Sequence, residues 1–223
     1  ILKWENVADQ PYANRWLVFI AYIIGLSIGV HLLNLLVIPA IVYIYYFKKY
    51  QTTKAGVIKA ALVSMILIAV IMWGIIPGVF VVAGWFELLF VNTFGLPFNT
   101  GVAVYAILLI AALTYGIRYT LKHNHTVANT ALTCFVVMLI GYSCYAMTVI
   151  RSSSNPPIDE NNPDNVFSLQ SYLARDQYGD EPLLYGQYYN APAIAIEDGA
   201  PIYYQNKKTG KYEVVSHKTE VEY

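Results

Sequence analysis

The sequence predicts an α-helical multi-pass membrane protein with about five spans, the first two forming a short hairpin, followed by the start of an extracytoplasmic α/β domain. Composition is the first reason, since 57% of the residues are hydrophobic and only 13% are charged, whereas soluble domains carry about 25% charged residues. The second reason is that the charges between Trp16 and Ile150 lie almost entirely in two short clusters. We therefore expect a transmembrane region over residues 1–150 and a soluble segment over residues 151–223.

Three apolar stretches are long enough to be membrane spans. They cover residues 55–84, 101–117 and 126–150. A helix needs about 20 mostly apolar residues to cross the hydrocarbon core of a bilayer, and shorter or longer stretches adjust by tilting. Each stretch therefore predicts a transmembrane helix.

The first apolar stretch, residues 16–47, is too long for one perpendicular crossing. It has no Asp, Glu, Lys or Arg, and as a single helix it would run about 48 Å against a core of roughly 30 Å. Two short helices that meet near Gly29 and His31 fit this length better. A single, strongly tilted helix is the alternative.

The orientation follows from the positively charged residues near the spans. With a hairpin first, eight of them fall on one side and only Arg151 on the other. Because Lys and Arg are enriched in cytoplasmic loops, we expect residues 151–223 on the extracytoplasmic side of a cytoplasmic (inner) membrane. The eight are Lys3, Arg15, Lys48, Lys49, Lys54, Lys59, Arg118 and Lys122.

An aromatic segment at residues 81–98 lies on the predicted outer side. It carries five aromatic rings and a single acid, Glu87. Such rings settle at the lipid–water interface, so the segment predicts an interfacial helix that ends in a turn at residues 95–97.

The soluble segment begins with turn-forming residues and continues with short elements. Residues 152–164 are rich in Ser, Asn, Pro and acids and predict turns. A helical pattern runs from residue 163 to near Gly179, and residues 183–189 resemble a buried strand. Residues 201–204 and 211–215 flank Asn206–Gly210, which is a hairpin signal.

The sequence contains no motif for nucleotide or metal chemistry. Gly-rich phosphate loops and His/Cys clusters with zinc spacing are missing. Net charge is zero with no basic run, so we expect no nucleic-acid partner. No cofactor is predicted, and a requirement for a divalent metal is left open.

Two sets of polar residues are candidate site residues. The first set is His31 and Asn34, which lie one helical turn apart in an apolar stretch, where polar side chains need partners or a wet cavity. They are interpreted either as a helix-to-helix hydrogen bond or as the polar wall of a substrate cavity.

The second set of candidate site residues follows the last predicted span and has more charged side chains. Arg151 and Arg175 are candidates to hold a lipid phosphate, and Asp159 and Glu160 are candidates for a base or a cation ligand. A solvated linker followed by a capped helix explains most of the same residues.

Three strings in the chain resemble a known family. They are ANRWLVFIAYIIGLSIGVHLLNLL (residues 13–36), GIIPGVFVVAGWFELLFVNTFGLPFNTG (74–101) and RSSSNPPIDENNPDNVFSLQSYLARDQYGDEPLLYGQ (151–187). They resemble the middle of a family of bacterial multi-pass membrane proteins formerly of unknown function. That family is similar to the animal transmembrane protein O-mannosyltransferase.

The resemblance implies a glycosyltransferase of the membrane-embedded GT-C type. Such an enzyme takes a sugar from a polyprenyl-phosphate carrier and transfers it to a protein acceptor. The expected partners are therefore the lipid-linked sugar donor, the protein acceptor and the lipid bilayer. The family's acidic motif, expected to hold the catalytic base, has no counterpart in this sequence. We therefore expect a fragment of the enzyme that lacks the base.

Two other function classes remain open from the sequence. One is a transporter subunit, although the spans are nearly free of the ionisable residues that transporters place at the midplane. The other is a non-catalytic scaffold of an envelope complex, with the soluble segment as its docking module.

Overall fold

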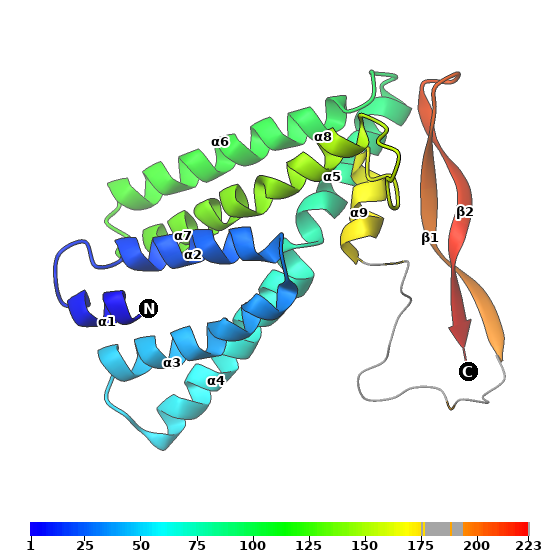
Figure 1. The fold of residues 1–223 in the computed structure, drawn as a ribbon. Helices are drawn as coiled ribbons and strands as arrows, with labels where there is room; N and C mark the ends of the chain where they lie inside the picture. The colour runs from blue at the N-terminus through cyan, green and yellow to red at the C-terminus, as the bar shows by residue number, and fades with distance from the viewer. Residues whose placement is uncertain (175, 177–187, 189–193, 223) are drawn as a thin grey trace. The chain divides into compact units, whose positions relative to one another are not determined.

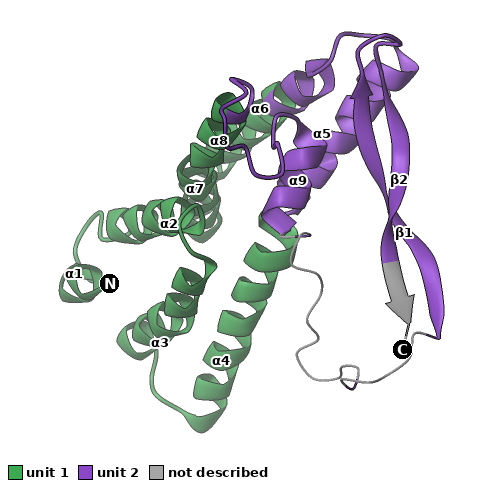
Figure 2. Ribbon diagram, turned by 45° about the vertical axis from the view of Figure 1, so that its right-hand side comes forward, with its two compact units in different colours: residues 1–76, 107–151 green, residues 77–106, 152–223 purple. Residues whose placement is uncertain are grey.

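The computed structural model describes residues 1–174, 176, 188 and 194–222 of the 223-residue chain. The described chain is mostly helical, with one small antiparallel sheet at its C-terminal end (Figure 1). It divides into two compact units, residues 1–76 with 107–151 and residues 77–106 with 152–223 (Figure 2).

The helical elements are α1 (Leu2–Val7), α2 (Arg15–Ile28), the 3₁₀ helix η1 (Leu32–Leu36), α3 (Val37–Lys49), α4 (Lys54–Ala69), the π-helix η2 (Val70–Ile75), α5 (Gly78–Leu88), the π-helix η3 (Leu89–Thr93), α6 (Thr100–Lys122), α7 (Thr126–Tyr142), the 3₁₀ helix η4 (Ser143–Tyr145), α8 (Ala146–Ser152) and α9 (Val166–Ala174). The strands are β1 (Ala195–Asn206) and β2 (Lys211–Glu222).

Four helical stretches are long and apolar enough to cross a membrane. They are Leu32–Lys49, Lys54–Thr93, Thr100–Lys122 and Thr126–Ser152, and the apolar helix Arg15–Ile28 is shorter. Their outward surfaces carry many large apolar side chains, as lipid-facing helices require. By length and composition, these helices are consistent with a membrane protein. That α2 also crosses the bilayer stays a prediction.

The predicted reversal near Gly29 and His31 is confirmed. Helix α2 ends at Ile28, the backbone of His31 is extended, and a new helical segment begins at Leu32. From this turn α2 and α3 lead back toward the same end of the unit (Figure 1). A single helix over residues 16–47 is therefore excluded.

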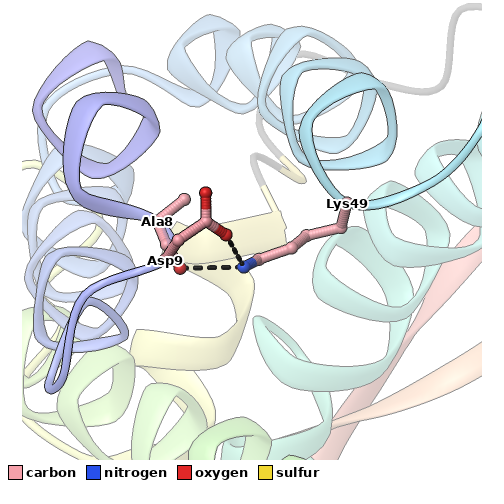
Figure 3. Close-up of polar contacts among 3 residues, drawn as sticks. All are labelled: Ala8, Asp9 and Lys49. Carbon is pink, nitrogen blue, oxygen red and sulfur yellow. Dashed lines mark hydrogen bonds and ion pairs between the residues drawn. The ribbon is translucent and has the colours of Figure 1, made fainter.

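Lys49 closes the open end of this hairpin. Its Nζ donates to the carbonyl oxygen of Ala8 at 2.8 Å and pairs with the Asp9 carboxylate at 2.9 Å (Figure 3). The C-terminus of α3 therefore lies beside the segment that joins α1 to α2. The hydrogen bond and charge of Lys49 lower the pKa of the Asp9 carboxyl.

Helices α2 and α7 pack through small residues. A Cβ atom on Gly141 would lie 2.6 Å from the backbone nitrogen of Leu26, and one on Gly25 would overlap the backbone of Met138. Small residues let membrane helices approach backbone to backbone, where dispersion contacts replace the hydrophobic effect. These two glycines therefore fix the crossing of α2 and α7.

The second unit contains α5, η3, the start of α6, α9 and the β-hairpin. The side chain of Asn165 accepts hydrogen bonds from the backbone N–H groups of Phe167 and Ser168, which caps the start of α9. Strands β1 and β2 pair antiparallel from Ala195↔Glu222 to Asn206↔Lys211, with two register shifts near Pro201.

The predicted turn of the hairpin is also confirmed. The side chain of Asn206 accepts from the backbone of Lys208 and Thr209, and Gly210 takes the left-handed φ of 67°. The helix predicted to end near Gly179 is described as far as Ala174, and the strand expected at residues 183–189 lies largely outside the described residues.

Candidate functional site

A buried carboxylate lies at the centre of the second unit. Glu87 is in α5, is 0% exposed, and is the only acid between Asp9 and Asp159. An ionised carboxylate only accepts hydrogen bonds and is costly to bury unless it is paired or hydrogen-bonded. Its partners therefore decide what the site can do.

The start of α6 supplies two of these partners. The backbone N–H of Asn99 donates to Oε1 of Glu87 at 2.5 Å, and the backbone N–H of Val102 donates to Oε2 at 3.1 Å. The first N–H groups of a helix have no partner inside the helix, and the helix dipole favours negative charge there. Glu87 thus caps α6 from another helix.

The local sequence makes this approach possible. Asn99 has a φ of 69°, in the left-handed region that asparagine tolerates better than most residues. Gly101 lies directly against α5, where a Cβ atom would overlap the backbone of Phe86 and Glu87. A glycine at 101 is therefore required for the start of α6 to reach the carboxylate.

The third partner comes from the β-hairpin. The hydroxyl of Tyr212 in β2 donates to Oε1 of Glu87 at 3.1 Å and accepts from Nε2 of Gln205 at 2.8 Å. Tyr212 is only 3% exposed. Burial and the nearby Glu87 charge raise the pKa of Tyr212, so its hydroxyl keeps the proton that it donates.

Asn92 makes a second attachment between the hairpin and η3. Its side-chain amide donates to the carbonyl oxygen of Tyr212 and accepts from the backbone N–H of the same residue, both at 2.8 Å. Asn92 therefore occupies the outer hydrogen-bonding groups of β2, which an edge strand would otherwise leave open at this position.

Aromatic rings enclose the polar groups. The ring of Tyr212 lies 5.1 Å from that of Phe98 and 4.9 Å from that of Phe167, measured between centroids. Phe167 also packs on Gly84 of α5 and lies 4.7 Å from the ring of Tyr203. The site is a closed, hydrogen-bonded junction with an apolar wall, which fits an anchoring role for Glu87.

Of the predicted cluster after the last span, Asp159 lies in a hydrogen-bonded loop. The hydroxyl of Ser152, 2% exposed, donates to the Asp159 carboxylate at 2.7 Å and lies 3.1 Å from Oδ1 of Asn162. Asn161 and Asn162 take left-handed φ values of 61° and 40°. Ser152 therefore organises the linker as a compact loop with Asp159 half-buried.

The other predicted site residues are exposed or lie outside the described residues. Arg151 and Glu160 are exposed, and Arg175 lies outside the described residues. His31 and Asn34 are both exposed, and Nδ1 of His31 accepts from the backbone N–H of Leu33, which caps η1. Within the described ranges, no group of three or more His, Cys, Asp or Glu side chains is placed to hold a metal ion.

Sequence reasoning missed the junction around Glu87. The available signal was a lone acid inside an apolar aromatic segment, followed after 12 residues by Asn99 and then Gly101. The partner Tyr212 lies 125 positions away, so no local pattern connects it to Glu87.

Comparison with protein families gives two matches. Residues 1–54 match the family described as Protein O-mannosyl-transferase TMEM260 N-terminal domain, and residues 179–223 match a Family of unknown function (DUF8416). Comparison with curated proteins and with solved structures gave no match. Over α1 to α3, the chain is thus similar to a domain of a protein O-mannosyltransferase.

Proposed function

We propose that this chain is part of a membrane glycosyltransferase that transfers a sugar from a polyprenyl-phosphate carrier to a hydroxyl group of a protein. The match of residues 1–54 to a protein O-mannosyltransferase domain carries this proposal. The apolar helices support it, because the long chain of such a donor needs a bilayer or a membrane-facing groove.

The reaction is a displacement at the anomeric carbon of the sugar. The acceptor oxygen forms a bond to this carbon, the bond from the carbon to the phosphate oxygen breaks, and polyprenyl phosphate leaves with the electron pair. A base takes the proton of the acceptor hydroxyl. Cationic groups that hold the phosphate stabilise the charge that develops on the leaving group.

Arg151 is the residue that we assign to the donor phosphate. It lies in the last turn of α8, at the end of the stretch Thr126–Ser152, and its side chain is exposed. In the described part of the chain it has no ion-pair partner. Its planar guanidinium is suited to paired contacts with phosphate oxygens.

The proposal also includes an orientation of the chain in the membrane. The soluble segment and Arg151 lie on the extracytoplasmic face, as the bias of the charged loops predicts. Arg175, predicted as a second phosphate ligand, is kept in the proposal as a residue to test.

The test is sugar transfer to an acceptor peptide by the complete enzyme, measured across a titration of lipid-linked donor. We expect transfer with the unmodified protein, and its absence under conditions where the protein is folded would overturn the proposed function. Arg151→Ala and Arg175→Ala should each raise the donor KM roughly ten- to a hundred-fold, since one charge-assisted hydrogen bond contributes about 1.5–3 kcal/mol.

Arg118→Ala is the matched control for these two variants. Arg118 is an exposed arginine in α6, and the charge bias predicts it on the opposite side of the membrane from Arg151. Its replacement should leave the donor KM unchanged. An unchanged donor KM in the Arg151 and Arg175 variants, with transfer intact, would contradict the site and leave the function standing.

A further inference from the structure

The open end of the α2–α3 hairpin gathers positive charge. Lys3, Arg15, Lys48 and Lys49, here called the basic collar, lie on α1, α2 and α3, and all four are exposed. The bond from Lys49 to the carbonyl of Ala8 joins these helices at one end (Figure 3). Positive charge therefore collects at the open end of the hairpin.

Among the residues that the structure describes, Lys49 is the member of the basic collar that forms an ion pair. It pairs with Asp9 at 2.9 Å. The charge of Lys48 also acts on Asp9 and contributes to the lowered pKa of that carboxyl. Glu5 is the one acid of α1, and Asp9 follows the helix, so two acids stand against four cations and the collar keeps an excess of positive charge.

Lys3 and Arg15 share one aromatic ring. Nζ of Lys3 lies 5.8 Å and Cζ of Arg15 lies 5.6 Å from the centroid of the Trp16 ring. Neither cation is paired with a carboxylate among the residues that the structure describes. Two like charges held at one ring repel each other, and an anion bound beside them would relieve that repulsion.

Apolar groups surround this pair of cations. Trp4 is fully buried with Ala8 and Ala13, and Trp16 packs against this cluster. Leu2 and Tyr12 are exposed close by in the sequence. Tryptophan and tyrosine favour the headgroup region of a bilayer, so we expect Lys3 and Arg15 at the level of lipid phosphates.

We infer that Lys3 and Arg15, beside Trp16, form a binding site for the headgroup phosphate of an anionic phospholipid. The ligand is a membrane lipid that anchors the hairpin, and the site is separate from the donor site proposed at Arg151. The inference does not depend on the glycosyltransferase activity, because it rests on the charge and geometry of the basic collar.

Tryptophan fluorescence provides the test. In the purified chain carrying Trp73→Phe and Trp85→Phe, the half-buried Trp16 reports on adjacent lipid, because Trp4 is fully buried. Nanodiscs would contain brominated phosphatidylglycerol or brominated phosphatidylcholine, which quench fluorescence on contact. Each cation should contribute about 1 kcal/mol to the binding of an anionic headgroup, so at low salt we expect phosphatidylglycerol to bind roughly thirty-fold more tightly than phosphatidylcholine. This preference should fall as the salt concentration rises.

Matched charge removals make the test specific. The double variant K3Q/R15Q should lose most of the preference, whereas R118Q/K122Q removes the same charge from the exposed end of α6 and should keep it. Equal loss in both double variants, or no preference in the unmodified protein, would overturn the site. Displacement of the brominated lipid by glycerol phosphate at constant ionic strength would show a site for free anions and would also overturn the lipid assignment.

A salt titration covers the case in which K3Q/R15Q does not fold. In the protein with Lys3 and Arg15 intact, the preference for phosphatidylglycerol that Trp16 quenching reports should fall as ionic strength rises, since the site is partly exposed. A strong preference that does not change with salt would contradict a site formed by these two cations.

Discussion

Replacing Tyr212 by phenylalanine removes one oxygen atom from the junction around Glu87 and leaves the ring in place. The ring contacts with Phe98 and Phe167 and the two backbone bonds to Asn92 do not involve the hydroxyl. The variant therefore isolates the bond from the Tyr212 hydroxyl to the Glu87 carboxylate, which measures 3.1 Å.

The expected cost follows from the type of bond. A hydrogen bond to a charged group contributes about 1.5–3 kcal/mol, compared with roughly 0.5–1.5 kcal/mol for a neutral pair. Gln205, which also loses its partner hydroxyl, is half-buried and has access to water. We therefore expect the hairpin of the Tyr212→Phe protein to open about 10- to 150-fold more often.

Hydrogen–deuterium exchange of residues 195–222 measures this opening directly. Tyr204→Phe is the control, because Tyr204 lies on the same hairpin and is 60% exposed. In a Glu87→Gln protein, Tyr212→Phe should increase hairpin opening less, by the amount expected for the loss of a hydrogen bond between neutral groups. If residues 195–222 of the Tyr212→Phe protein exchange at the same rate as in the wild-type protein, the reasoning is refuted. Asn92 and the ring contacts would then hold the hairpin without the buried hydrogen bond.

Three further predictions concern pH, packing and topology. Since burial and the Glu87 charge raise the pKa of Tyr212 above its ordinary value of 10.0, hairpin stability should be complete below that pH and fall as pH rises above it. Hydrogen exchange should show that Tyr212→Phe removes this alkaline loss. Gly25→Ala should destabilise the packing of α2 on α7 by about 1–3 kcal/mol in thermal unfolding, whereas Gly78→Ala, with open space around it, should not. Cysteines at Ser153 and Thr53, without the two native cysteines, should label oppositely with an impermeant maleimide, and labelling at Thr53 alone would reverse the orientation.

The membrane region was predictable because its signals are local. The length of residues 16–47 favoured a reversal over a single tilted helix, and the structure shows the break between Ile28 and Leu32. The hairpin turn at Asn206–Gly210 was equally accessible, since asparagine and glycine supply the turn conformation within five residues. Helix ends were less predictable: the apolar stretch ending at Gly84 continues as helix to Thr93.

The candidate site was not predictable to the same degree. Among the polar residues that the sequence singles out, His31 and Arg151 are exposed, whereas the most buried polar side chain in the described part of the chain is that of Glu87. Its burial becomes favourable only when α6 and β2 bring three donors to it. Two of those donors are backbone N–H groups, which every residue except proline has, so residue type by itself does not identify them.

These bonds also determine the part that Glu87 plays in the proposed reaction. A general base must present a free lone pair to an acceptor hydroxyl within hydrogen-bond reach. Glu87 is 0% exposed and uses both oxygens for bonds inside the second unit. Asp159 and Glu160 are more accessible to solvent. Glu87 is therefore a positioning residue, which ties the start of α6 to the hairpin, and the proton of the acceptor hydroxyl must pass to a different group.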